Sequence, residues 1–186
     1  MSKHHRNRNW APAPQPLPED AHVIDNHTHV ASVVPFSQAM SHEAMEKGQG
    51  EVPVYSVDEL LEQAQKVGVE GVIDCGCELP NLMTAIDMAR EHPGTVHAAI
   101  AIHPNEAVLH GHRGAPGPDG LPIKYKPWHD IPFDEAMAEV HRLATTYPNQ
   151  VVAIGETGMD LFRTGESAQE LQREAFRAHI ARAKAR

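Results

Sequence analysis

The chain has 186 residues and is 41% hydrophobic, which is enough to form the core of one domain. Its net charge of −9 argues against binding nucleic acid through a broad basic surface, because such binding depends on many Lys and Arg contacts to phosphate. Bound divalent cations would have to attract a phosphate substrate instead. Two cysteines, Cys75 and Cys77, are too few for a disulfide framework, and no segment resembles a signal peptide or a membrane helix. We therefore expect a cytoplasmic protein.

Residues 1–20 are basic and then rich in proline, a composition that predicts an extended tail outside the fold. The folded region, residues 21–186, begins with a short apolar strand that ends in the motif DNHTH. A long loop is expected after this strand. Ser56 and Glu59 have the spacing of a capping box, which predicts that a helix begins directly after Ser56.

Apolar strands and helical patterns alternate along the rest of the chain. The predicted strands are residues 69–76, 95–104 and 150–158, and the predicted helices that follow or separate them are residues 79–94, 132–148 and 166–186. A loop rich in Gly, Pro and His, residues 104–130, is long enough to be a lid or a binding element.

Strand–helix units of this kind, with strands that are apolar throughout, predict an α/β fold with a parallel sheet. A doubly wound open sheet and a (β/α)8 TIM-like barrel both fit this pattern. A complete barrel needs roughly 250 residues. On the barrel interpretation, the chain supplies about four of the eight βα units, which form the N-terminal half.

The first motif with candidate chemistry follows the first strand. Alternate residues of a strand point to one face, so Asp25, His27 and His29 are expected to project together. Two imidazoles at the carboxyl end of a strand can hold one cation, and the carboxylate can fix their tautomers. For an arbitrary H-x-H, a pair of surface histidines is the commoner outcome, but active sites in α/β folds lie at this edge of the sheet.

Two further motifs follow later strands. Glu156 lies in GETGMD after the strand VVAI, where a carboxylate could bridge two cations, although a solvated acid in a glycine-flanked turn has the same pattern. His103 follows the strand before it and is a candidate substrate contact, or a histidine that simply hydrogen-bonds a loop. Arg163 is a candidate for binding a substrate phosphate. Cys75 and Cys77 are expected to be packing residues.

These motifs, in this order, resemble the TatD-like family of metal-dependent deoxyribonucleases, which belongs to the amidohydrolase-type TIM-barrel superfamily. The similarity runs from about His22 to the end of the chain. Residues 25–29 match the family pattern D-x-H-x-H. Residues 101–104 match G-x-H-P, with Ala in place of Gly, and residues 155–160 match G-E-x-G-L-D, with Met in place of Leu. The family's glutamine-rich helix is matched by residues 169–176.

The resemblance implies a barrel that carries two divalent ions, Mg, Mn or Zn, and hydrolyses phosphodiester bonds of DNA. In that family, the residues matching His27 and His29 hold one metal and the one matching Glu156 bridges both. Asp160 would orient the ligands and His103 would lie near the substrate phosphate, which makes Glu156, Asp160 and His103 the candidate catalytic residues.

The family also supplies ligands from strands five, six and eight, and this sequence ends in the helix before strand five. The chain is therefore expected to have weak metal affinity and weak activity by itself, unless self-association or a second chain completes the barrel. Two alternatives stay open. One is an inactive half-barrel that serves as an interaction module through its exposed sheet edge, and the other is a related barrel hydrolase of an amide or an aminoacyl ester.

Overall fold

The computed structural model describes residues 16–48, 53–113 and 123–185. Four strands form one sheet in the order β1-β2-β3-β4, which is also their order in the chain. Their bounds are β1 Val23–Thr28, β2 Val69–Gly76, β3 Val96–Ile100 and β4 Val151–Ala153. The pairs β2/β3 and β3/β4 are parallel, which confirms the predicted α/β fold. Closure into a (β/α)8 barrel stays a prediction.

The chain divides into two compact units, and strands β1 and β2 contribute residues to both. The first unit takes in the described residues up to Asp25 and then His29–Gly71, and the second takes in Asn26–Thr28 and the chain from Val72 onward. Each unit is described by itself below.

The first unit contains helices α1 (Val30–Glu46) and α2 (Val57–Lys66), which contact one another. The capping box is present: Ser56 Oγ accepts from the Glu59 N–H at 3.2 Å, and Glu59 Oε2 accepts from the Ser56 N–H at 2.8 Å. Helix α1 occupies the segment for which we predicted a long loop, so that prediction was wrong. Valines and Pro35 in its first two turns weaken the helical signal in the sequence.

Of the predicted tail, only residues 16–20 lie within the described part of the chain. The Leu17 N–H donates to the Val67 carbonyl at 2.8 Å, just after α2. The Leu17 side chain lies beside Gly68, whose φ of +96° favours glycine. This short stretch therefore contacts the first unit.

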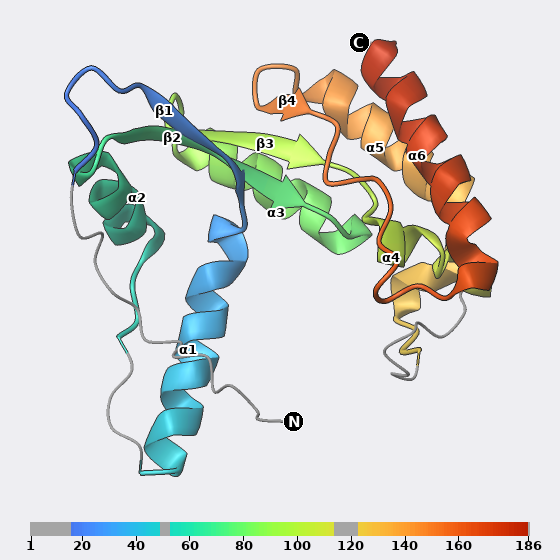
Figure 1. Ribbon diagram of the computed structural model, residues 1–186, viewed down its shortest axis with the longest axis horizontal. Helices are drawn as coiled ribbons and strands as arrows, with labels where there is room; N and C mark the ends of the chain where they lie inside the picture. The colour runs from blue at the N-terminus through green and yellow to red at the C-terminus, as the bar shows by residue number, and fades with distance from the viewer. Residues whose placement is uncertain (1–15, 49–52, 114–122, 186) are drawn as a thin grey trace. The chain divides into compact units, whose positions relative to one another are not determined.

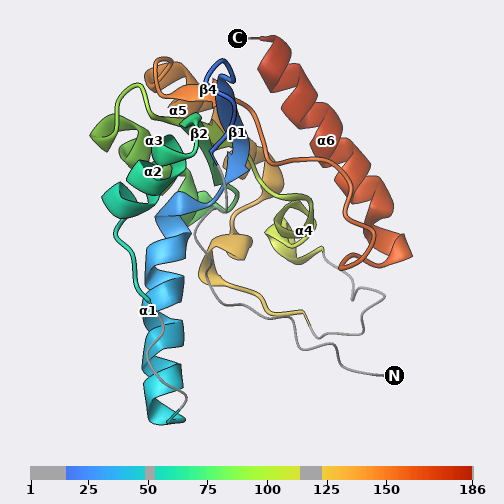
Figure 2. The same ribbon diagram turned by 60° about the vertical axis from the view of Figure 1, so that its left-hand side comes forward.

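The second unit packs helices α3 (Leu79–Glu91), α5 (Phe133–Thr146) and α6 (Gln169–Lys184) around strands β3 and β4 (Figures 1 and 2). Helix α3 packs on β3 and contacts α5, and α5 contacts α6. The largest apolar side chains of its core are fully buried; they are Leu82, Ile86, Ile100, Ile102, Val96, Val140 and Val151. None of the helices in the described ranges has the length and hydropathy to cross a membrane.

The segment predicted as a loop over residues 104–130 contains short helices where it is described. They are α4 (Pro104–Ala107), η1 (His110–His112) and η2 (Pro127–Asp130). Helix α4 also contacts α6. The first and last parts of this segment are therefore built into the second unit.

Candidate metal centre

The strand register brings three chain segments to the carboxyl-end edge of the sheet. Gly76 at the end of β2 is paired with Ile100 at the end of β3. Beyond those ends, the His103 N–H donates to the Cys77 carbonyl at 2.9 Å, and the Gly155 N–H donates to the Ile100 carbonyl at 3.2 Å. Because these bonds extend the ladder, the residues that follow β2, β3 and β4 meet at one place.

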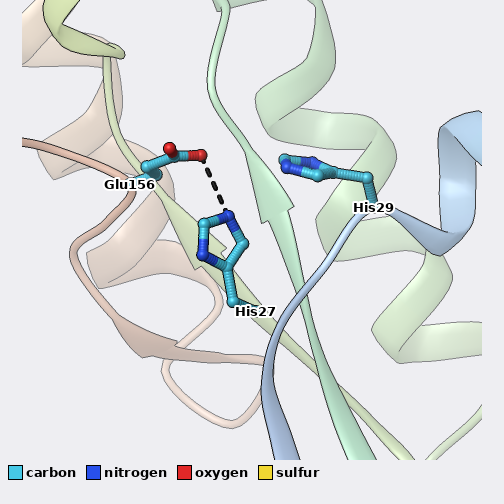
Figure 3. Close-up of side chains that lie close together, drawn as sticks. All are labelled: His27, His29 and Glu156. Atoms are coloured by element: carbon cyan, nitrogen blue, oxygen red, sulfur yellow. Dashed lines mark hydrogen bonds and ion pairs between the residues drawn. The ribbon is translucent and has the colours of Figure 1, made fainter. Parts of the chain in front are cut away.

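Glu156 is the centre of this edge, and it contacts a side chain from each of three segments. Its Oε2 atom lies 3.1 Å from His27 Nε2, which Figure 3 marks, and 3.5 Å from Cys77 Sγ. Its Oε1 atom lies 3.4 Å from His103 Nε2. All four residues belong to the second unit. The structure thus brings together His27, His103 and Glu156, and it adds Cys77, which we had assigned to packing.

Hydrogen bonding orients the imidazole of His103. Its Nδ1 atom accepts from the Asn105 N–H at 3.1 Å. In the neutral ring this bond leaves the proton on Nε2, which is the atom that faces Glu156. His103 is 24% exposed and so presents an N–H donor beside the carboxylate at an edge that solvent reaches.

Burial raises the pKa of the Cys77 thiol to about 12, and the negative charge of Glu156 adds to that effect. The group therefore stays a neutral thiol near neutral pH. It donates a weak hydrogen bond to Glu156 Oε2.

His29 directly precedes helix α1 as its N-cap residue, and it belongs to the first unit. It follows His27 by two residues. An extended chain rises about 3.3 Å per residue, so the Cα atoms of the two histidines are no more than about 7 Å apart. Chain connectivity therefore keeps the backbone of His29 close to that of His27.

Asp160 forms hydrogen bonds within its own loop and to Asn105. Among the described residues, no interaction between Asp160 and Glu156 is observed. The Asp160 carboxylate accepts from Asn105 Nδ2 at 2.7 Å and from the N–H groups of Phe162 and Arg163. Burial would raise the pKa of Asp160, but these hydrogen bonds outweigh it and the pKa is lowered. The guanidinium of Arg163 is exposed and lies 6.0 Å from the centroid of the Phe162 ring.

His179 on α6 holds the backbone next to this edge, and the sequence analysis did not single it out. Its Nε2 accepts from the buried Ile102 N–H at 3.0 Å, and its Nδ1–H donates to the Ala175 carbonyl at 2.7 Å. Thr157, next to Glu156, lies 3.1 Å from the same Nδ1. Burial lowers the pKa of His179, so the ring is neutral at pH 7. No local signal links positions 102 and 179.

Comparison with known proteins decides the family. The family model described as TatD related DNase matches residues 24–186. The chain belongs to the TatD related DNase family. The family membership confirms the resemblance that the motifs at the strand ends indicated in the sequence.

Curated relatives match about two thirds of the chain. An uncharacterized metal-dependent hydrolase TatD of Mycobacterium tuberculosis is 32% identical over 133 residues, which are 69% of this chain and 41% of that protein. A protein of Erwinia tasmaniensis named 3'-5' ssDNA/RNA exonuclease TatD is 29% identical over 67% of this chain and 38% of its own length. The chain spans about two fifths of the length of these relatives.

A solved structure supports the fold. A TatD family hydrolase from Entamoeba histolytica superposes with a TM-score of 0.55 and 20% identity, over 88% of this chain and 46% of that one. At this identity the similarity concerns the fold alone, and it agrees with the parallel sheet and the order of its strands.

Proposed function

We propose that the chain carries a metal centre of a TatD-type hydrolase that cleaves phosphodiester bonds of DNA, with His27, His29 and Glu156 as ligands. The observation that supports this most is the 3.1 Å approach of His27 Nε2 to Glu156 Oε2 at the carboxyl-end edge of the sheet. Imidazole and carboxylate donors that converge there from separate segments are the usual parts of such a site.

The residues present fit a divalent ion chemically. His27 is 52% exposed and Glu156 is 32% exposed, so an ion can reach both donor atoms from solvent. The two imidazole nitrogens and one carboxylate of the proposed set suit Zn²⁺ or Mn²⁺, and Mg²⁺ prefers a set richer in oxygen. His27 would bind the metal through Nε2, the ring atom that faces Glu156.

The two oxygens of Glu156 face different partners. Oε2 faces His27 and Cys77, whereas Oε1 faces His103. A carboxylate in this position can bridge two ions, and this is our argument for a two-metal centre. Such ions, when bound, lower the pKa of water and neutralise charge on phosphoryl oxygens.

The other residues of the edge serve by binding and orientation. We propose that His103 donates its Nε2–H to a phosphate oxygen, since Asn105 already holds that tautomer. The Cys77 thiol holds Glu156 by donating to Oε2. Asp160 fixes the loop after Glu156, and the exposed Arg163 on the same loop is a candidate phosphate ligand.

The substrate class rests on two supports. The relative from Erwinia tasmaniensis is named as a 3'-5' ssDNA/RNA exonuclease, which supports a nucleic acid substrate here. The net charge of −9 requires that bound cations, rather than a basic surface, attract the phosphate backbone.

The test is hydrolysis of a labelled single-stranded DNA by the full chain with Mn²⁺ or Mg²⁺, beside the variants His27→Ala and Glu156→Gln. His22→Ala is the matched control, since His22 is an exposed histidine that pairs with Glu70 at the other end of β1. We expect weak metal-dependent turnover from the wild type, its loss in both site variants and its retention in the control. Turnover unchanged in both site variants would contradict the assignment, and hydrolysis of an amide or an aminoacyl ester in place of DNA would contradict the substrate.

A further inference from the structure

The segment of residues 123–131 is attached to the second unit by three polar side chains. Lys126 Nζ lies 2.9 Å from Glu78 Oε1. Trp128 Nε1 donates to Glu106 at 3.1 Å, and His129 Nε2 lies 2.7 Å from the same Glu106 oxygen. Because His129 is fully buried and Glu106 is 13% exposed, their bond is shielded from water and anchors the segment, and the half-buried pair of Lys126 and Glu78 adds to it.

Both anchoring carboxylates are neighbours of the candidate metal centre. Glu78 directly follows Cys77, whose thiol contacts Glu156. Glu106 lies in α4, which begins directly after His103. The 123–131 segment is thus fixed to the ends of β2 and β3, beside the edge where Glu156 lies.

Tyr125 is the aromatic residue that this segment presents to solvent. It is 43% exposed. Its ring centroid lies 4.4 Å from that of His112, with an angle of 43° between the planes, and 6.2 Å from that of the buried His129. Asp130 holds His112 through Nε2. Tyr125 is therefore supported by two rings that are themselves held, and part of its surface stays open.

The charge around Tyr125 determines which part of a substrate it can receive. Lys126 is already paired with Glu78 and lies 3.9 Å from Glu106, and its ammonium also lies 4.8 Å from the Trp128 ring. Lys126 is therefore engaged with the two anchoring carboxylates, whereas Lys124, next to Tyr125, is exposed and is the cation of this segment that can meet a backbone phosphate. An exposed aromatic ring, in contrast, can stack with any nucleobase.

We propose that Tyr125 is a substrate-binding residue that stacks on a base of a single-stranded nucleic acid whose backbone reaches the Glu156 edge. This inference rests on the proposed function and adds a residue that determines preference for bases. Such a contact strengthens binding of single strands with exposed bases and leaves the metal centre unchanged.

The experiment compares two fluorescent probes in fluorescence anisotropy with the full chain in Ca²⁺. One probe is a decathymidylate, and the other is a phosphodiester chain of equal length with abasic residues. We expect the wild type to prefer the decathymidylate. Tyr125→Leu keeps an apolar side chain against His112 and should weaken decathymidylate binding at least about fivefold, without changing abasic binding. Tyr125→Phe should behave as the wild type.

Tyr147→Ala is the matched control, because Tyr147 follows α5 and precedes β4, at the amino-end edge of the sheet. It should leave both affinities unchanged. Equal decathymidylate affinity in Tyr125→Leu and the wild type would overturn the inference and leave the proposed function intact. A loss of both probes in Tyr125→Leu would also overturn it, since a structural role of the ring explains that result. Failure of the wild type to bind either probe would refute the proposed substrate class as well.

Discussion

His179 is the position where a single substitution tests the support of the candidate centre most sharply. The ring is 1% exposed, and its Nε2 atom is the acceptor for the Ile102 N–H. Ile102 is fully buried, so water cannot replace the lost acceptor in a His179→Leu variant. A buried donor left without a partner costs about 1–3 kcal/mol. We expect His179→Leu to lower the free energy of unfolding by about 2 kcal/mol at pH 7.5.

The same residue makes stability depend on pH. The pKa of His179 is lowered in the fold by burial, so the unfolded chain binds the proton more readily. Its contribution is complete above the unfolded pKa of about 6.5 and is lost as pH falls below that value. One such group changes the free energy of unfolding by at most about 1.4 kcal/mol per pH unit.

Urea unfolding at pH 7.5, 6.5 and 5.5 measures both effects. His179→Gln is the informative comparison, since a side-chain amide oxygen can still accept a hydrogen bond but does not titrate. We expect His179→Gln to lose less stability than His179→Leu at pH 7.5 and to show a smaller decrease than the wild type at pH 5.5. A residual decrease is expected from His110, whose pKa is also lowered by burial. An unchanged pH dependence in His179→Gln would refute this reasoning.

Two other predictions concern the edge itself. A Cβ added at Gly76 would lie 2.7 Å from the Asn81 carbonyl oxygen and 3.1 Å from Leu82 Cα. Gly76→Ala should therefore lower the free energy of unfolding by about 1–3 kcal/mol in urea titrations. Unchanged stability would contradict the tight approach of β2 to α3. Because the pKa of Cys77 is about 12, iodoacetamide should alkylate it at pH 8 more than about tenfold more slowly than it alkylates glutathione. Mass spectrometry of a Cys75→Ser variant measures this rate. Equal rates would show that the thiol is not buried against Glu156.

Local patterns predicted the elements whose signals lie within a few residues. The capping box at Ser56 predicted the start of α2, and the apolar run from Val69 to Gly76 predicted β2 with its observed bounds. Helix α1 was missed because its first turns contain valines and Pro35, which favour other structures in isolation. Contacts with the rest of the fold determine that this segment is helical, and a local sequence pattern carries no information about those contacts.

The candidate site divides in the same way. Strand-end motifs predicted that His103 and Glu156 lie together, and the register of the sheet explains why they do. The contact of Cys77 with Glu156 spans 79 positions, and the bond between Ile102 and His179 spans 77. Each depends on how β2, β3 and α6 pack, so the residue types alone gave no sign of either.

Calorimetric titration with Mn²⁺ and with Zn²⁺ tests the central claim, that His27 and Glu156 bind a metal ion, most directly. We predict weak but saturable binding to the wild-type chain at pH 7.5, because His27 and Glu156 supply part of a metal-ligand set. Both His27→Ala and Glu156→Gln should reduce the affinity at least about tenfold, and His22→Ala should not. Equal affinities in the wild type and both site variants would contradict the claim.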